Sequence, residues 1–165
     1  MKISKIVLMV ALTGFLAACS TTQKVDDKDV HATDGQRGSK NKTSYKFRWE
    51  NPSDELYNRV VYFGFDKSDV SGEDKALLTK HATFLSANTS QKVRLEGHSD
   101  ERGSREYNIG LGERRSQSVR RLMLFQGVAD RQIEAVSYGE ERPAVEGHDE
   151  DAWNKNRRVE LVYIQ

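Results

Sequence analysis

The sequence lacks features that are typical of several large classes of protein. Its single cysteine, Cys19, cannot form a disulfide within the chain. It has no apolar run of the roughly 20 residues that a membrane-spanning helix needs. Its 26 basic and 25 acidic side chains leave a net charge of +1, so no bulk positive field exists to attract nucleic acid or an anionic membrane surface. Binding specificity must therefore be local.

The N-terminus has the pattern of a processing signal. Two lysines precede an apolar stretch over residues 6–16, which is too short to remain as a transmembrane helix. The stretch leads into Leu16-Ala17-Ala18-Cys19, which resembles a bacterial lipobox and implies cleavage before Cys19 and lipidation of that residue. The alternative is an ordinary signal peptide followed by an incidental cysteine. Ser20 is not the aspartate associated with retention in the inner membrane, so a lipid anchor in the outer membrane is expected.

Composition divides the chain into three parts. Residues 1–18 are expected to form the signal peptide, and residues 19–48 a lipidated N-terminus followed by a flexible tether. The tether, from about residue 20 to residue 46, is almost free of apolar side chains and cannot form a core. Residues 49–165 have the composition of one folded domain, which the anchor would hold in the periplasm.

The patterns of residues 49–165 alternate between strand and helix. Runs of β-branched, aromatic or alternating apolar residues predict strands over residues 60–65, 93–97, 133–138 and 158–163. Apolar residues at helical spacing predict helices over residues 71–88, from residue 104 or 105 to residue 125, and briefly within residues 148–156. This order favours an α/β sandwich of two layers, with about four strands and with the helices packed on one face of the sheet.

Arg115 is the most informative position of the second long helix. A predicted apolar stripe runs along that helix, and Arg115 lies within it; the stripe consists of Leu111, Ser118, Val119, Leu122 and Phe125. Leaving one member of a buried ion pair unmatched costs roughly 3–5 kcal/mol, so Arg115 is expected to need a carboxylate. That carboxylate belongs either to the domain itself, as a structural salt bridge, or to a ligand held by the planar guanidinium.

Two polar loops follow predicted strands and add acidic groups to this region. Asp66 follows the first strand directly, and Asp100 lies in the loop after the second. Ligands of open α/β sheets usually dock at the C-terminal ends of strands. The two aspartates would accept hydrogen bonds from an ammonium while Arg115 takes a carboxylate, which makes a clamp for a zwitterionic amino-acid end. Either aspartate could instead cap a helix.

Several motifs in sequence order resemble one family. They are Gly97-His98-Ser99-Asp100-Glu101-Arg102-Gly103, Glu106-Tyr107-Asn108-Ile109, Leu111-Gly112-Glu113-Arg114-Arg115, Val136-Ser137-Tyr138-Gly139, Gly147-His148-Asp149-Glu150 and Lys155-Asn156-Arg157-Arg158-Val159. Together they resemble the peptidoglycan-associated lipoproteins, which carry OmpA-like peptidoglycan-binding domains. The similarity covers residues 62–163, and the lipobox and tether lie where that family has them. The resemblance implies an OmpA-like sandwich with a mixed sheet.

The resemblance also implies a ligand and partners. It implies noncovalent binding of meso-diaminopimelate in the peptidoglycan stem peptide, with Asp100 and Arg115 matching the binding aspartate and arginine of the family. Phe65 and Asp66 are then expected at the pocket, and Asn108 and Leu111 as residues that support or line it. Membership would place the protein in the Tol-Pal system, with TolB binding a surface that overlaps the peptidoglycan site, and with a role in envelope integrity and cell division.

Two other classes of function fit parts of the sequence. His98, Asp100 and Glu101 lie in one loop and suggest an enzyme with acid–base or metal chemistry. No nucleophile is apparent, since Cys19 is used by the lipid, and no second histidine stands at metal-ligand spacing from His98. A lipoprotein that docks on a protein assembly is the other alternative. We expect a binding protein that is not an enzyme and that uses no metal, cofactor or nucleic acid.

Overall fold

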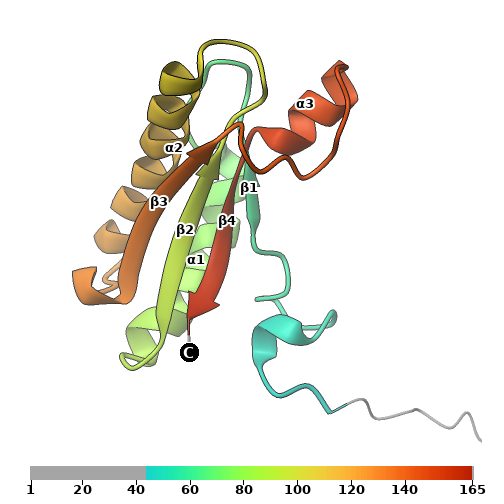
Figure 1. Ribbon diagram of the computed structural model, residues 1–165. Coiled ribbons are helices and arrows are strands. Elements are labelled where there is room, and N and C mark those ends of the chain that lie inside the picture. Colours follow the sequence, from blue (N-terminus) through green and yellow to red (C-terminus); the bar gives the residue numbers. More distant parts are fainter. Residues whose placement is uncertain (1–43, 165) are drawn as a thin grey trace, which may run out of the picture. The chain divides into compact units, whose positions relative to one another are not determined.

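The computed structural model describes residues 44–164 (Figure 1). The predicted signal peptide, the lipidation site at Cys19 and nearly all of the predicted tether lie outside these residues. The elements are, in order, η1 (Arg48–Glu50), β1 (Val60–Tyr62), α1 (Gly72–Ala87), β2 (Lys92–His98), α2 (Arg105–Phe125), η2 (Asp130–Gln132), β3 (Ile133–Gly139), α3 (Glu150–Asn156) and β4 (Arg158–Ile164). Among the described helices, none is long and apolar enough to cross a membrane.

The four strands form one mixed sheet with the order β1-β4-β2-β3. β4 lies antiparallel to both β1 and β2, and β2 lies parallel to β3. Helices α1 and α2 lie on one face of this sheet (Figure 1). The predicted two-layer α/β sandwich is therefore confirmed. Because β1 and β2 are both antiparallel to β4, they run in the same direction. The loops that follow β1 and β2 therefore leave the sheet at the same end of the strands.

The core lies between the sheet and the two long helices. Alternate residues of the strands point into it, as their period of two requires; they are Val61, Val93, Leu95, Val159, Leu161 and Tyr163. The helices contribute Leu78, Leu85, Val119 and Met123 from their inner faces. Trp49 closes one end of this core, since its ring stacks on Tyr163 with centroids 4.1 Å apart.

Hydrogen-bonded caps set the starts of the helices. The hydroxyl of Ser71 accepts a bond of 3.1 Å from the backbone N–H of Asp74 before α1, and Ser104 does the same for Tyr107 before α2 at 3.2 Å. Such side chains satisfy backbone donors that have no partner within the helix. The predicted extents of the two long helices are confirmed to within a residue or two.

The first strand is shorter than predicted. It was expected over residues 60–65 but ends at Tyr62, because the chain turns at residues 64–67. The backbone N–H of Lys67 donates to the carbonyl of Gly64 at 3.2 Å, and Asp66 has a left-handed backbone with φ 54°. An aromatic run thus continues past the strand because Phe65 belongs to a turn that faces solvent.

The predicted stripe of α2 is partly wrong. Phe125 is 89% exposed, and the buried face consists of Asn108, Leu111, Gly112, Arg115, Ser116, Val119 and Met123. At 100° per residue, the centre of this face lies roughly 60° from the centre of the predicted one. The shift arises because small residues, Gly112 and Ser116, face the sheet, and hydrophobicity alone does not mark them as buried.

Two glycines let α2 lie against the backbone of β2. A Cβ atom built on Gly97 would come within 2.0 Å of the carbonyl oxygen of Gly112, and one on Gly112 would come within 2.3 Å of the Ser137 hydroxyl. Real side chains do not approach so closely, so helix and strand could keep this spacing only with glycine at both positions.

We therefore expect Gly97→Ala to lower the free energy of unfolding by at least about 2 kcal/mol, because the added methyl group forces α2 away from the sheet. Urea unfolding followed by circular dichroism measures the change. Gly72→Ala is the matched control, since no atom lies within 4 Å of its new methyl group, and it should be neutral or stabilising by up to about 1 kcal/mol. Equal effects of the two substitutions would contradict the close contact.

Candidate functional site

Arg115 joins the two loops that follow β1 and β2. Its Nε donates to the carbonyl of Lys67 at 2.8 Å, Nη1 to that of His98 at 2.8 Å, and Nη2 to that of Gly64 at 3.0 Å. The side chain is fully buried on the inner face of α2. One guanidinium thereby fixes two backbone groups of the loop after β1 and one at the end of β2, which lie far apart in the sequence.

Of the two alternatives for the carboxylate expected at Arg115, an acid of the domain is not found in the described part of the chain. Within residues 44–164, no carboxylate lies within ion-pair distance of its guanidinium; the three carbonyl oxygens take that place. Burial lowers the pKa of Arg115 to about 10, and the negative charge of Asp100 opposes that shift. Arg115 therefore stays protonated at neutral pH, and hydrogen bonds to carbonyl dipoles offset part of its desolvation.

Asp100 is held by two other arginines. Its carboxylate accepts bonds from Arg102 Nη2 at 2.7 Å and from Arg157 Nη1 at 3.1 Å, and from the backbone N–H of Arg102 at 3.1 Å. Burial raises the pKa of Asp100, but these bonds outweigh it and lower the pKa. Asp100 neither caps a helix nor hydrogen-bonds to Arg115 in this structure.

A pocket of about 250 Å³ lies between the loops that follow β1 and β2 and the first turns of α2. It is lined by Phe65, Asp66, Asp100, Arg102, Gly103, Tyr107 and Leu111. Four of the residues predicted at the site, Phe65, Asp66, Asp100 and Leu111, thus lie together. The other two, Arg115 and Asn108, do not line this pocket and are buried, with exposed fractions of 0% and 1%. A Cβ atom on Gly103 would lie 3.5 Å from the amide oxygen of Asn108, which places that side chain directly behind the pocket wall.

Asp66 is held in an unfavourable backbone conformation at the mouth of the pocket. It is the single non-glycine residue with positive φ in the part of the chain that the structure describes. The hydroxyl of Tyr107 donates to its carboxylate. Left-handed conformations cost on the order of 1–3 kcal/mol and gather at binding sites, where surrounding contacts maintain them. The turn therefore presents the Asp66 carboxylate in one fixed direction.

Arg102 forms a wall of the pocket that the sequence analysis missed. Its guanidinium lies between the rings of Phe65 and Trp153, 4.1 Å from each centroid. Cation–π contacts of this kind stabilise by about 0.5–2 kcal/mol. Arg102 stands in a motif quoted above. Tyr107 lies one turn of α2 before Leu111, so helical spacing could have predicted Tyr107 at the pocket. No spacing indicated the stack with Trp153, because α3 brings that ring from a distant segment.

Among the three residues that suggested enzyme chemistry, none hydrogen-bonds to another in the described part of the chain. His98 is 2% exposed, and neither ring nitrogen has a hydrogen-bond partner in the described part of the chain. Glu101 bonds instead to His148 Nδ1 and to Trp153 Nε1, each at 2.8 Å. Over residues 44–164, no group of three or more His, Cys, Asp or Glu side chains is arranged to hold a metal ion.

The chain is similar to proteins of one family along almost its whole length. Residues 62–157 match the OmpA family. A peptidoglycan-associated lipoprotein of Pasteurella multocida is 42% identical over 162 residues, which cover 98% of this chain and 99% of that protein. The peptidoglycan-associated lipoprotein of Pseudomonas aeruginosa is 52% identical over 112 residues, 66% of each chain.

Solved structures agree with this similarity. The crystal structure of the peptidoglycan-associated lipoprotein of Burkholderia pseudomallei matches with a TM-score of 0.70 at 43% identity, covering 72% of this chain and all of that one. The C-terminal domain of MotB from Helicobacter pylori has the same fold, with a TM-score of 0.61 at 17% identity over 66% of this chain and 85% of that one.

His98 should make stability depend on pH. Burial lowers its pKa from 6.5 to about 4, so the unfolded chain takes up a proton near pH 6.5 while folded His98 stays neutral. Above pH 6.5 this difference does not affect the free energy of unfolding. As the pH falls from 6.5 to 4, it lowers the free energy of unfolding by about 3 kcal/mol. We expect His98→Phe, which keeps a ring against Tyr138, to remove that part of the decline in urea unfolding.

The exposed His148 supplies the control for this measurement. His148→Gln should not reduce the decline between pH 7 and pH 4, because the hydrogen bond to Glu101 raises the pKa of His148, whereas burial lowers that of His98. Parallel pH curves for the parent and His98→Phe would show that burial of His98 is not the cause.

Proposed function

Because the chain belongs to the OmpA family, and within it to the peptidoglycan-associated lipoproteins, we propose that its folded domain binds peptidoglycan noncovalently and connects the outer membrane to the cell wall. The observation that carries this proposal is the pocket beside Asp100, where two carboxylates, one arginine and three apolar or aromatic walls meet. A zwitterionic end with a short aliphatic chain fits that combination of groups.

The ligand proposed is the meso-diaminopimelate of the stem peptide. Its ammonium group would donate to Asp66 and Asp100, whose carboxylates reach the pocket from the two loops. Asp100 already accepts three bonds, and a carboxylate offers about four lone-pair positions, so one position remains for a ligand. The methylene chain would lie against Phe65, Tyr107 and Leu111, where apolar surface is buried from water.

The carboxylate of the ligand would bind to Arg115 and Arg102 through their positive charges. Arg115 has five N–H donors, of which three are used by carbonyl oxygens, and the remaining two belong to Nη1 and Nη2. Since Arg115 is fully buried, direct contact requires a small displacement of the loops above it. Asn108 would position the pocket wall, because its side chain lies behind Gly103.

The lipobox supports the location of the domain. Acylation at Cys19 would hold the chain in the outer membrane, because several acyl chains bind far more strongly than one. The roughly 30 residues between Cys19 and the folded domain could span at most about 100 Å if fully extended. The anchored domain, facing the periplasm, would then reach the cell wall below the membrane.

The family also supports a place in the Tol-Pal system, with a role in envelope integrity and cell division. TolB is the proposed partner, on a surface that overlaps the peptidoglycan pocket. Phe65 and Tyr107, which are 56% and 45% exposed, give that surface aromatic side chains of the kind enriched in protein interfaces. The alternative function, a lipoprotein that binds only a protein assembly, uses the same surface without the cell wall.

We expect the full-length protein in detergent to cosediment with purified sacculi that contain diaminopimelate. Asp66→Asn should weaken retention about tenfold, because the ammonium loses a charged acceptor while asparagine still tolerates the left-handed backbone. Asp100→Asn should weaken it at least as much, with thermal unfolding used to check that the variant is folded.

Asp130→Asn is the matched control for both substitutions. Asp130 is an exposed aspartate of η2 that pairs with Arg120 of α2, and it lies outside the pocket. The loss of its charge should therefore not change sedimentation. If the parent itself stays in solution, cell-wall binding is wrong and the assembly role is favoured. Competition by a diaminopimelate tripeptide, but not by the lysine tripeptide, would identify the ligand.

If TolB and peptidoglycan share a surface, they should exclude each other. We expect a soluble diaminopimelate tripeptide to reduce capture of purified TolB by the full-length protein, and Tyr107→Ala to weaken TolB capture. Simultaneous binding of both, with unchanged affinities in surface plasmon resonance, would place TolB on another surface.

A further inference from the structure

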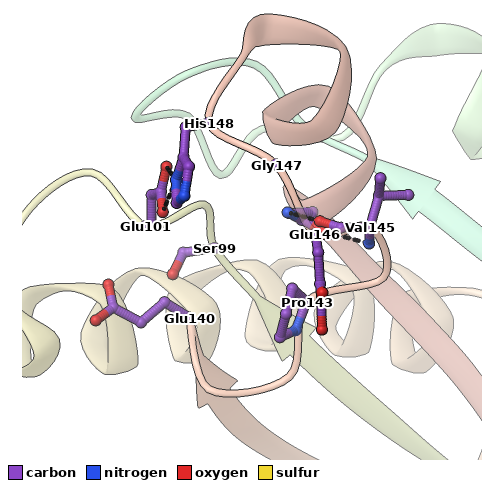
Figure 2. Close-up of a pocket in the computed structure, with 9 residues that line it drawn as sticks. Ser99, Glu101, Glu140, Pro143, Val145, Glu146, Gly147 and His148 are labelled. Carbon is purple, nitrogen blue, oxygen red and sulfur yellow. Dashed lines mark hydrogen bonds and ion pairs between the residues drawn. The ribbon is translucent and has the colours of Figure 1, made fainter.

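A second pocket lies on the other side of the loop that carries Asp100. It has a volume of about 270 Å³ and lies between residues 99–101 and the segment of residues 140–148 that follows β3. Figure 2 shows Glu101 and His148 on one side of this hollow, Pro143 and Glu146 on the other, and Ser99 and Glu140 below. None of the roles proposed above uses this pocket.

Ser99 supplies an unsatisfied polar group to the pocket. The residue is 3% exposed, and its hydroxyl has no hydrogen-bond partner within the described residues. Its side chain extends from the loop toward the space beside Glu140 (Figure 2). Burying a hydroxyl without a partner costs free energy, which a ligand that donates a hydrogen bond would recover.

The charge of the pocket is negative. Glu101, Glu140 and Glu146 all line it, and His148 is the one basic residue among its lining residues. Glu101 is engaged by His148 and Trp153, and Glu140 accepts from the Asn108 amide. Glu146 has neither an ion pair nor a hydrogen bond from its side chain within residues 44–164. Free acceptor capacity therefore remains at Glu140 and Glu146, on both sides of Ser99.

We propose that this second pocket binds a primary alkylammonium group. An ammonium has three N–H donors and no acceptor, which matches two carboxylates and one hydroxyl. Pro143 and Val145 line the same pocket and would contact the aliphatic chain behind the charged end. The clustered carboxylates do not have the arrangement of a metal site in the described part of the chain, which favours an organic cation. A lysine side chain of a bound protein and the end of a polyamine present this same chemistry.

The test titrates isotopically labelled full-length protein in detergent micelles with N-acetyl-lysine-N-methylamide and follows the backbone amides by NMR. Saturable shifts are expected at Ser99 and in residues 140–148. The norleucine analogue lacks the ammonium and should cause no such shifts. Cadaverine is titrated in parallel. Tighter binding of the lysine compound points to a protein side chain, and tighter binding of cadaverine points to a polyamine.

Substitutions assign the groups that bind the probe. The double variant Glu140→Gln, Glu146→Gln should bind the lysine compound about tenfold more weakly, because both charged acceptors are lost. Ser99→Ala should weaken binding less and should not lower the melting temperature, since it removes an unpaired hydroxyl. Glu134→Gln, an exposed glutamate at the start of β3 paired with Arg94, is the matched control and should bind like the parent.

Three outcomes would overturn the proposal. One is the absence of saturable shifts with either amine, and another is equal shifts with the norleucine analogue. The third is unchanged binding in a folded double variant. The proposal is independent of peptidoglycan binding, because Asp66→Asn should leave the titration unchanged while it weakens retention on sacculi.

Discussion

The buried guanidinium of Arg115 is the interaction on which the rest of the site depends. It lies at the centre of α2 and donates to two carbonyl oxygens of the loop after β1 and to one at the end of β2, from which the second loop leaves. Taking this charge out of water is costly, and the cost is offset only while all three oxygens are in place. The two loops are therefore fixed relative to each other through one side chain. Phe65, Asp66 and Asp100, which line the pocket, lie within two residues of the carbonyl groups that this side chain holds.

A second group of charged side chains connects the loop that carries Asp100 to α3. Arg157 is 3% exposed and donates to Asp100, to the carbonyl of Phe63 and to Glu150, while Arg102 bonds to Asp100 and stacks between two rings. Asp100 thus balances two arginines at once. An ammonium group that approaches the pocket meets carboxylates whose directions are already set, so little ordering of these side chains accompanies its binding.

Local patterns predicted the elements well, because local chemistry determines them. Ser71 and Ser104 begin helices through bonds made within one turn, and alternation identified the strands. Helical phase also placed Arg115 on the inner face. The phase did not show what Arg115 meets, because Gly64, Lys67 and His98 approach it only through the topology of the sheet. The resemblance to a family supplied Asn108 and Leu111, whereas Arg102 and Trp153 meet through a tertiary stack that leaves no periodic signal.

The left-handed turn at Asp66 limits which sequences this site can have. Asparagine and glycine accept such a backbone readily, whereas β-branched and bulky side chains do not. Position 66 is thus restricted by the geometry of the main chain before any ligand is considered. Asparagine and glycine preserve the turn, but both remove the carboxylate. Drift at this position would therefore tend to lose either the turn or the charge.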